Sequence, residues 1–153
     1  MFLASPPRRG LFVGASAMRP INRIIIHMAY TRPSMDVGVH EIRDWHVNGN
    51  GWRDIGYHFV IRRSGEIEDG RPVEQPGAHT KGRNSDSIGI CLVGGRRENA
   101  DAVDVNYTRA QWDALMHLVG ELKAEHPSAQ VRGHRDYAER ECPGFDVAAW
   151  WGE

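Results

Sequence analysis

The chain has 153 residues, of which 41% are hydrophobic and 25% are charged, and its formal net charge at pH 7 is -1. This length allows one domain of ordinary size, with a core large enough to need no disulfide. The near-zero charge excludes a globally basic nucleic-acid-binding protein, so we expect no direct nucleic-acid partner. No run approaches the roughly 18 apolar residues of a membrane-spanning helix, so we expect no transmembrane segment.

Residues 1–17 form an extension without a regular hydrophobic period. A basic Pro-Pro-Arg-Arg-Gly stretch separates two short apolar patches, whereas a secretory signal has a basic start and then about 7–15 uninterrupted apolar residues. Ala15-Ser16-Ala17 has the small side chains of a cleavage site, so export by a signal stays an alternative. We predict a poorly ordered extension over 1–17, with Met18 as an alternative start, and one domain over 18–153.

Beyond the extension, short β-branched runs are mixed with helical patterns, which predicts an α/β fold. The expected elements in chain order are a buried strand over 23–28, a helix from Asp36 that stops at 48–51, a strand over 57–62, a hairpin turn at 64–65 into a strand over 66–68, a buried strand over 88–93, a helix over 109–125 and a short strand from Val131.

The helix over 109–125 has the clearest pattern. Thr108 and Gln111 form a capping box, because each side chain can satisfy a free amide of the first turn, and Pro127 marks the end. One face carries apolar residues at helical spacing, which predicts that they are core residues: Trp112, Leu115, Met116, Val119 and Leu122.

The two cysteines lie in different settings. Cys91 belongs to an apolar run, where a thiol is usually a small buried hydrophobe, whereas Cys142 lies in a polar stretch. A disulfide between them is an alternative that no other feature supports. Zinc favours imidazole and thiolate ligands, and His134 precedes Cys142 by eight residues in a segment that can bend back. His27, at the end of a buried strand, is well placed to supply a third ligand.

Each candidate also has a structural interpretation. His27 fits a core histidine bonded to a backbone carbonyl, and His134 fits a surface loop residue. Cys142 fits a free exposed thiol. Tyr57 fits a strand aromatic, because it alternates with Phe59 along a half-buried face. Spacing alone therefore leaves the zinc hypothesis open.

Six stretches together carry a family resemblance: 24–27 (IIIH), 51–59 (GWRDIGYHF), 77–80 (GAHT), 84–90 (NSDSIGI), 133–136 (GHRD) and 142–146 (CPGFD). They resemble the zinc-dependent N-acetylmuramoyl-L-alanine amidases of the type-2 amidase and peptidoglycan-recognition superfamily. The short phage lysozyme-amidases, or endolysins, are especially similar. The stretches occur in the family's order and span roughly residues 23–151.

The resemblance implies a single α/β domain with a central mixed β-sheet flanked by helices, and one Zn²⁺ in a surface groove. It implies hydrolysis of the amide between N-acetylmuramic acid and L-alanine in peptidoglycan, leading to cell-wall lysis. The implied zinc ligands are His27, His134 and Cys142. Tyr57 would be catalytic beside the metal, and the segment of His79 and Thr80 would line the groove for the muramyl peptide.

Two positions depart from the phage relatives. Met28 follows the first ligand where those relatives commonly have cysteine, which affects packing. Arg140 stands two residues before Cys142, where they carry a functional lysine. Arginine stays charged at any pH that a protein tolerates, so Arg140 would supply fixed positive charge to the oxyanion rather than a proton. The alternative is a solvated arginine between Glu139 and Glu141.

Other functions remain as hypotheses. A binding module without catalysis would typically lack the cysteine ligand, which is present here. Some short phage relatives also bind and inhibit a phage RNA polymerase, so such a partner is a further hypothesis, as is a disulfide-linked redox protein. From the resemblance we expect a monomer that stays in the host cytoplasm until it is released to the cell wall.

Overall fold

The computed structural model describes residues 19–153, so the predictions for the extension and for Met18 lie outside the described residues. Within that range, one mixed sheet is built from β1 (Arg23–Met28), β2 (Phe59–Ile61), β3 (Ile67–Asp69), β4 (Ser87–Leu92) and β5 (Gln130–Gly133). The strand order is β3-β2-β4-β1-β5. β1 pairs in parallel with β4 and β5, and β2 pairs in parallel with β4 and antiparallel with β3. The predicted α/β domain with a central mixed sheet is confirmed.

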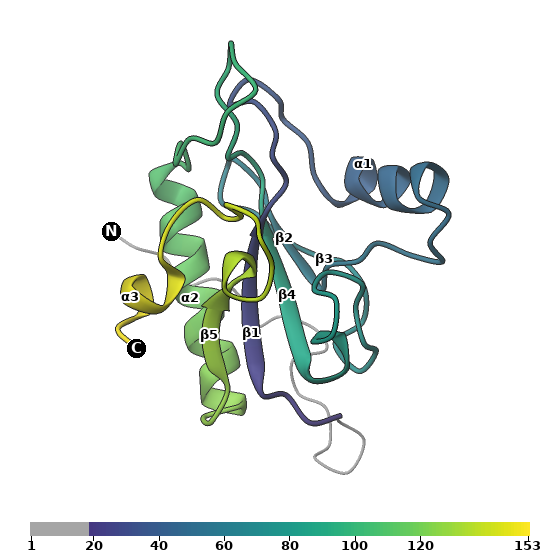
Figure 1. The fold of residues 1–153 in the computed structure, drawn as a ribbon, viewed down its shortest axis with the longest axis vertical. Coiled ribbons are helices and arrows are strands. Elements are labelled where there is room, and N and C mark those ends of the chain that lie inside the picture. Colours follow the sequence, from purple (N-terminus) through teal and green to yellow (C-terminus); the bar gives the residue numbers. More distant parts are fainter. Residues whose placement is uncertain (1–18) are drawn as a thin grey trace.

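Helices flank this sheet on both sides (Figure 1). The long helix α2 (Arg109–Glu125) lies on one side, and α1 (Val39–Asp44), which continues as a π-helical turn over Trp45–Gly49, lies on the other. The short α3 (Val147–Trp151) packs beside β5, and single 3₁₀ turns occupy Asn84–Asp86 and His134–Asp136. No helix among residues 19–153 has the length and apolar character needed to cross a membrane.

The helix predicted from Asp36 begins later, at Val39. Two carboxylates fix this start: Glu41 accepts the amide of Gly38 at 2.7 Å, and Glu68 accepts the amide of Val39 at 2.9 Å. Asp36 instead forms an ion pair with Arg62 at 3.0 Å, outside the helix.

Alternation along the strands sorts side chains between two apolar clusters, because successive residues of a strand point to opposite faces. On one face, residues of β1, β2, β4 and β5 pack against α2: Ile24, Ile26, Phe59, Ile61, Ile88, Ile90, Leu92 and Val131 meet Leu115, Leu118, Val119 and Leu122. On the other face, Val60 and Cys91 pack with Val39 and Ile42 of α1. His27, one residue after Ile26, therefore points to the α1 side, away from the main core.

The predicted capping box of α2 is confirmed, because the Thr108 hydroxyl accepts the Gln111 amide at 3.0 Å. The predicted core face is wrong at Met116, which is 46% exposed. Leu118, fully buried, belongs to the core stripe instead. The stripe follows positions 115, 118, 119 and 122, whereas Met116 is turned about 100° from Leu115 and points outward.

This difference generates a prediction about stability. Leu118→Ala should lower the free energy of unfolding by about 2–5 kcal/mol, because it leaves a cavity under the sheet. Met116→Ala, at a neighbouring position of the same helix, should change it by less than about 0.5 kcal/mol. Urea denaturation of both variants measures the two values. Equal losses would contradict the burial of the two side chains.

Candidate metal centre

Strand pairing brings the first two predicted ligands together. Ile26 of β1 pairs with Gly133 of β5, so the next residues, His27 and His134, emerge side by side at the carboxyl ends of two parallel strands. Their ring centroids are 4.6 Å apart. This edge is where the crevices of open α/β sheets usually bind ligands.

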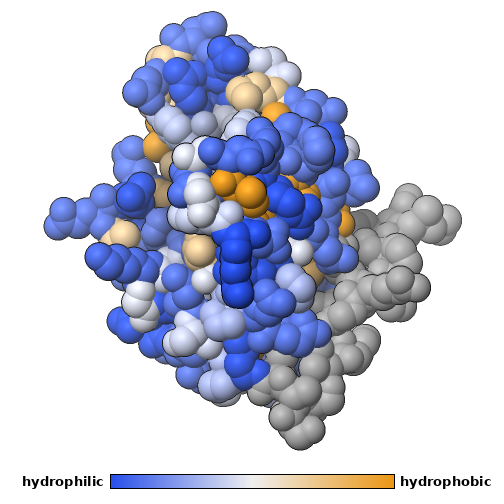
Figure 2. All heavy atoms as spheres, turned by 90° about the vertical axis from the view of Figure 1, so that its right-hand side faces the viewer, coloured by the Kyte–Doolittle hydropathy of each residue, from blue (hydrophilic) through white to orange (hydrophobic). Residues whose placement is uncertain are grey.

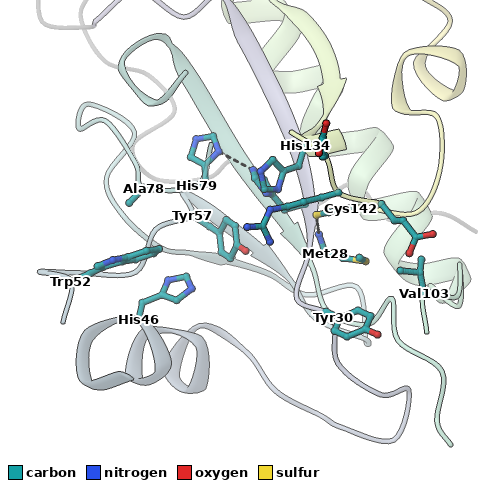
Figure 3. A pocket seen from close by; sticks show the side chains of 14 residues that line it. Met28, Tyr30, His46, Trp52, Tyr57, Ala78, His79, Val103, His134 and Cys142 are labelled. Atoms are coloured by element: carbon teal, nitrogen blue, oxygen red, sulfur yellow. Dashed lines mark hydrogen bonds between the residues drawn. The ribbon is translucent and has the colours of Figure 1, made fainter. Parts of the chain in front are cut away.

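A loop after β5 returns the third predicted ligand to the same point. The carbonyl of Cys142 accepts the Arg135 amide at 2.7 Å, and the Tyr107 hydroxyl donates to the Pro143 carbonyl at 2.7 Å. The peptide bond between Cys142 and Pro143 is cis. The Met28 amide donates to the Cys142 sulfur at 3.1 Å, so the loop is tied to β1 as well (Figure 3).

The three side chains fit a zinc ion. One ligand atom from each of His27, His134 and Cys142 lies within 4.8 Å of the others. Tetrahedral zinc, with bonds of about 2.0–2.3 Å, needs ligand atoms roughly 3.5 Å apart, so small side-chain rotations suffice. Two imidazoles and one thiolate also leave a fourth position open, as in catalytic zinc sites.

The two cysteines lie in different settings, as the sequence indicates, but both are buried. Both are free, so they do not form a disulfide with each other, and Cys91 is fully buried in the sheet. The alternative of an exposed thiol at Cys142 is wrong, because this residue is only 7% exposed. Its polar sequence neighbours point outward while its sulfur points to β1.

Burial sets the protonation of the three groups in the absence of metal. Burial lowers the pKa of His27 well below its ordinary value, and the nearby rings of His79 and His134 act in the same direction. Burial also lowers the pKa of His134, together with the charge of Arg140. It raises the pKa of Cys142 to about 11, opposed by the Met28 amide and by Arg140. The histidines are therefore neutral, as metal ligands must be, and the thiol must lose its proton to a metal.

His79 and Thr80 lie directly behind His27. Nε2 of His27 lies 2.8 Å from Nδ1 of His79 and 3.3 Å from the Thr80 hydroxyl, and Nε2 of His79 lies 3.2 Å from the Ser87 hydroxyl. Since Nε2 of His27 is occupied in this way, Nδ1 is its free nitrogen. Both residues border the groove as the sequence analysis expects, but they are 8% and 2% exposed, and their polar atoms face His27. Contact with substrate stays a prediction for both.

The His79 ring can lie this close to the sheet because of two glycines. A Cβ on Gly89 of β4 would stand 2.6 Å from the ring, and a Cβ on Gly77 would stand 2.7 Å from it. Side chains at these positions would therefore displace His79 from His27.

The ring of Tyr57 also packs against His27, with ring centroids 5.1 Å apart. It lies just before β2 and not within a strand, and it lines the same pocket as the three ligands. Burial raises the pKa of its hydroxyl well above the ordinary value, and the nearby thiols of Cys91 and Cys142 act in the same direction. Tyr57 therefore stays protonated and can donate a hydrogen bond.

Two groove residues have no role in the sequence analysis. His46 lies in the π-helical turn, where its Nδ1 accepts the Gly56 amide at 2.9 Å, so Nε2 is left to carry the proton. Its ring packs between Trp52 and Tyr57, with centroid distances of 4.7 and 5.4 Å. Trp52 lies in the stretch 51–59 that carries the family resemblance, but nothing else in the sequence indicates a role for it. His46 could not be found from the sequence, because no sequence pattern predicts the π-helical turn that positions it.

The ligands lie in an open groove on the α1 side of the sheet. A pocket of about 660 Å³ holds all three ligands with Tyr57, and Arg140 also lines it. A second pocket of about 630 Å³ shares the walls of Trp52, His134 and Arg140. The face shown in Figure 2, on the side of α1, is mostly hydrophilic with small hydrophobic spots.

The chain is similar in sequence to phage endolysins and in structure to a solved amidase. The chain is 46% identical over 130 residues to the endolysin of Klebsiella phage KP32, covering 85% of each chain. It is 45% identical over 128 residues to the endolysin of Escherichia phage T7, covering 84% of this chain and 83% of that one. Among solved structures, the N-acetylmuramoyl-L-alanine amidase LysC from Clostridium intestinale superposes with a TM-score of 0.71 at 26% identity, covering 95% of this chain and 90% of that one.

The family comparison agrees with these relatives. Residues 17–145 match the family model described as N-acetylmuramoyl-L-alanine amidase, which spans the sheet, both histidines and the cysteine of the metal centre. The chain belongs to the N-acetylmuramoyl-L-alanine amidase family.

Proposed function

We propose that this amidase cleaves the bond between muramic acid and L-alanine at a single zinc ion held by His27, His134 and Cys142. The observation that carries the proposal is the convergence of these three side chains at the carboxyl ends of β1 and β5. Zinc bound there supplies a Lewis acid and lowers the pKa of a coordinated water to about 7. The chain's own residues must position this chemistry and stabilise its charges.

His79 and Thr80 act on the orientation of His27. A histidine ligand usually donates its second ring N–H to a partner, which fixes the tautomer and the ring plane. With a metal on Nδ1 of His27, its Nε2–H would donate to Nδ1 of His79, and the His79 Nε2–H would donate to the Ser87 hydroxyl. This direction of donation leaves Nδ1 of His27 unprotonated toward the metal.

Tyr57 donates a hydrogen bond at the reacting centre. Its hydroxyl stays protonated, and its ring is held between His27 and His46. A fixed donor beside the scissile carbonyl stabilises the negative charge that develops on the oxygen during hydrolysis.

Arg140 supplies positive charge to the same oxygen. It lines both pockets of the groove. Burial raises the pKa of Cys142, which the charge of Arg140 opposes, and burial lowers the pKa of His134, to which the charge of Arg140 adds. Arg140 is itself exposed, as are its neighbours Glu139 and Glu141, which line the first of these pockets with it. The arginine therefore serves as a fixed cation and not as a proton donor.

In its biological setting, the protein lyses the cell wall as a phage or prophage endolysin does. We propose that it stays in the host cytoplasm until it is released to the wall, with peptidoglycan as its partner. Nothing among residues 19–153 favours the hypothesis of an RNA polymerase partner over this function.

Mass spectrometry of digested peptidoglycan tests the reaction. Zinc-loaded protein should release new lactyl carboxylates on muramic acid and free amino termini on L-alanine. Metal-free protein should release neither. New reducing sugar ends would identify a glycosidase and refute the proposal.

The cysteines offer a matched pair for the metal. Cys142→Ser should lose zinc and activity together, because a hydroxyl is a far poorer ligand than a thiolate. Cys91→Ser should keep one zinc per chain and lose about 1–3 kcal/mol of stability, because it buries a hydroxyl in the apolar cluster under α1. Zinc content by atomic absorption and urea denaturation separate the two effects. Zinc loss in both variants would overturn the ligand assignment.

Arg140 is tested by charge. Arg140→Ala should lower kcat by roughly 10²–10³ with zinc retained, the usual cost of one oxyanion donor, whereas Arg140→Lys should keep substantial activity. The lysine variant should also lose activity at alkaline pH, where lysine deprotonates and arginine does not. Arg135→Ala, at an exposed arginine that lines neither pocket, is the control. Full kcat in Arg140→Ala would leave Arg140 as a solvated surface residue.

A further inference from the structure

We propose that Tyr30, anchored by Asp101, forms a sugar-binding subsite that receives the glycan side of the substrate, while the opposite arm of the groove receives the stem peptide. The inference rests on the amidase activity and adds the direction in which the substrate lies. Tyr30 is not among the residues that the sequence analysis assigns to the site.

The groove has two arms that meet at the metal ligands (Figure 3). On the Cys142 side, the wall is formed by Met28, Tyr30 and Val103. On the Tyr57 side, Trp52 and Ala78 form the wall, and the second pocket continues the groove to Lys81, Asn84 and Tyr137. A substrate cut at the centre must therefore place one product in each arm.

The charges of the two arms differ. The second pocket is lined by two cations, Lys81 and Arg140, and no carboxylate lines it. The first pocket, which reaches into both arms, is lined by Glu139 and Glu141, and Glu141 lies close enough to Tyr30 to act on the pKa of its hydroxyl. Stem peptides carry free carboxylates, whereas the acid group of muramic acid is consumed in the scissile amide. The anionic peptide therefore fits the Lys81 arm, and the uncharged sugar fits the Tyr30 arm.

Tyr30 is held in a conformation that few side chains adopt. Its φ is +58°, and it is the non-glycine residue with positive φ among residues 19–153. The following residue is fixed on both sides, because the Thr31 amide donates to the Gly94 carbonyl at 3.0 Å and the Gly94 amide donates to the Thr31 hydroxyl at 2.8 Å. A bulky residue in the left-handed backbone conformation lowers the stability of the fold, and the surrounding contacts must hold it there.

A hydrogen bond aims the Tyr30 ring. Its hydroxyl donates to the Asp101 carboxylate, which comes from the loop after β4. The hydrogen bond to Asp101 raises the pKa of this hydroxyl above its ordinary value. The ring is left at the rim as a fixed apolar face for the C–H groups of a sugar, and the exposed carboxylate of Asp101 offers a second oxygen to sugar hydroxyls.

Room for a glycan strand continues past Tyr30. On its outer side the ring borders a hollow of about 350 Å³, which Trp45 also lines at 40% exposure. Arg32 in this hollow has Glu98 as its counter-ion at 3.8 Å. The next sugar of the strand can therefore lie in this hollow.

Two substrates with the same scissile amide test the direction. One is a GlcNAc-MurNAc peptide, and the other is a D-lactoyl peptide with the same stem but without sugar. Tyr30→Gly should lower the ratio of kcat/KM for the first to that for the second about tenfold, which corresponds to about 1.4 kcal/mol of lost contact. The change should lie mainly in KM. Glycine suits the positive φ, so this variant should fold and keep its zinc.

Two further variants sharpen the result. Tyr30→Phe keeps the ring and should keep most of the ratio. Lys81→Met should lower kcat/KM for both substrates alike, because both carry the stem peptide, and should leave the ratio unchanged.

Three outcomes would overturn the proposal: an unchanged ratio in Tyr30→Gly, a ratio in Tyr30→Phe as low as in Tyr30→Gly, or a change of the ratio in Lys81→Met larger than in Tyr30→Gly. Failure of the amidase activity is distinguishable, because the zinc-loaded parent would then cleave neither substrate.

Discussion

The parallel pairing of β1 with β5 is the interaction on which the site depends. It sets Ile26 opposite Gly133, and the next residue on each strand is a histidine of the metal centre. A shift of this register by one residue would turn one of the two rings to the α2 side, because side chains alternate along a strand. The buried isoleucines on the α2 face oppose such a shift, since it would expose them. The apolar core therefore determines the geometry of a polar site on the other face of the sheet.

The groups that are buried around the site are uncharged, and a glycine leaves space for one of them. His79 can reach Nε2 of His27 only because Gly89 of β4 leaves space for its ring. Burial keeps the histidines neutral and Tyr57 protonated. The metal-free centre is thus a set of neutral groups that needs no counter-ion in the fold. A divalent cation held by His27, His134 and the Cys142 thiolate would introduce charge into a pocket that Tyr57 and Arg140 also line.

Local patterns in the sequence predicted the elements whose signals are strong. The β-branched run of β1, the capping box of α2 and the buried setting of Cys91 all appear as expected. Met116 is expected in the core because positions 112, 115, 116 and 119 fit helical spacing as well as positions 115, 118, 119 and 122 do, and only the packing of the helix decides between the two sets. The zinc ligands followed from a resemblance and not from spacing, since a loop of eight residues admits many shapes. The bond from His79 to His27 and the left-handed Tyr30 depend on contacts across the sheet that no local pattern encodes.

The proposed direction of the substrate depends on the different charges of the two arms of the groove and not on the metal ligands or the catalytic residues. In the proposed reaction, the metal and the Tyr57 hydroxyl would act on a carbonyl and would distinguish weakly between the two groups joined to it. Orientation must come from the arms, where Lys81 on one side and Glu141 on the other make one direction electrostatically more favourable for an anionic peptide. These charges lie in exposed positions and are screened by salt, so a rigid contact is needed beside them. Tyr30, fixed through Thr31 and Asp101, provides such a contact, because its ring loses little freedom when a sugar packs on it.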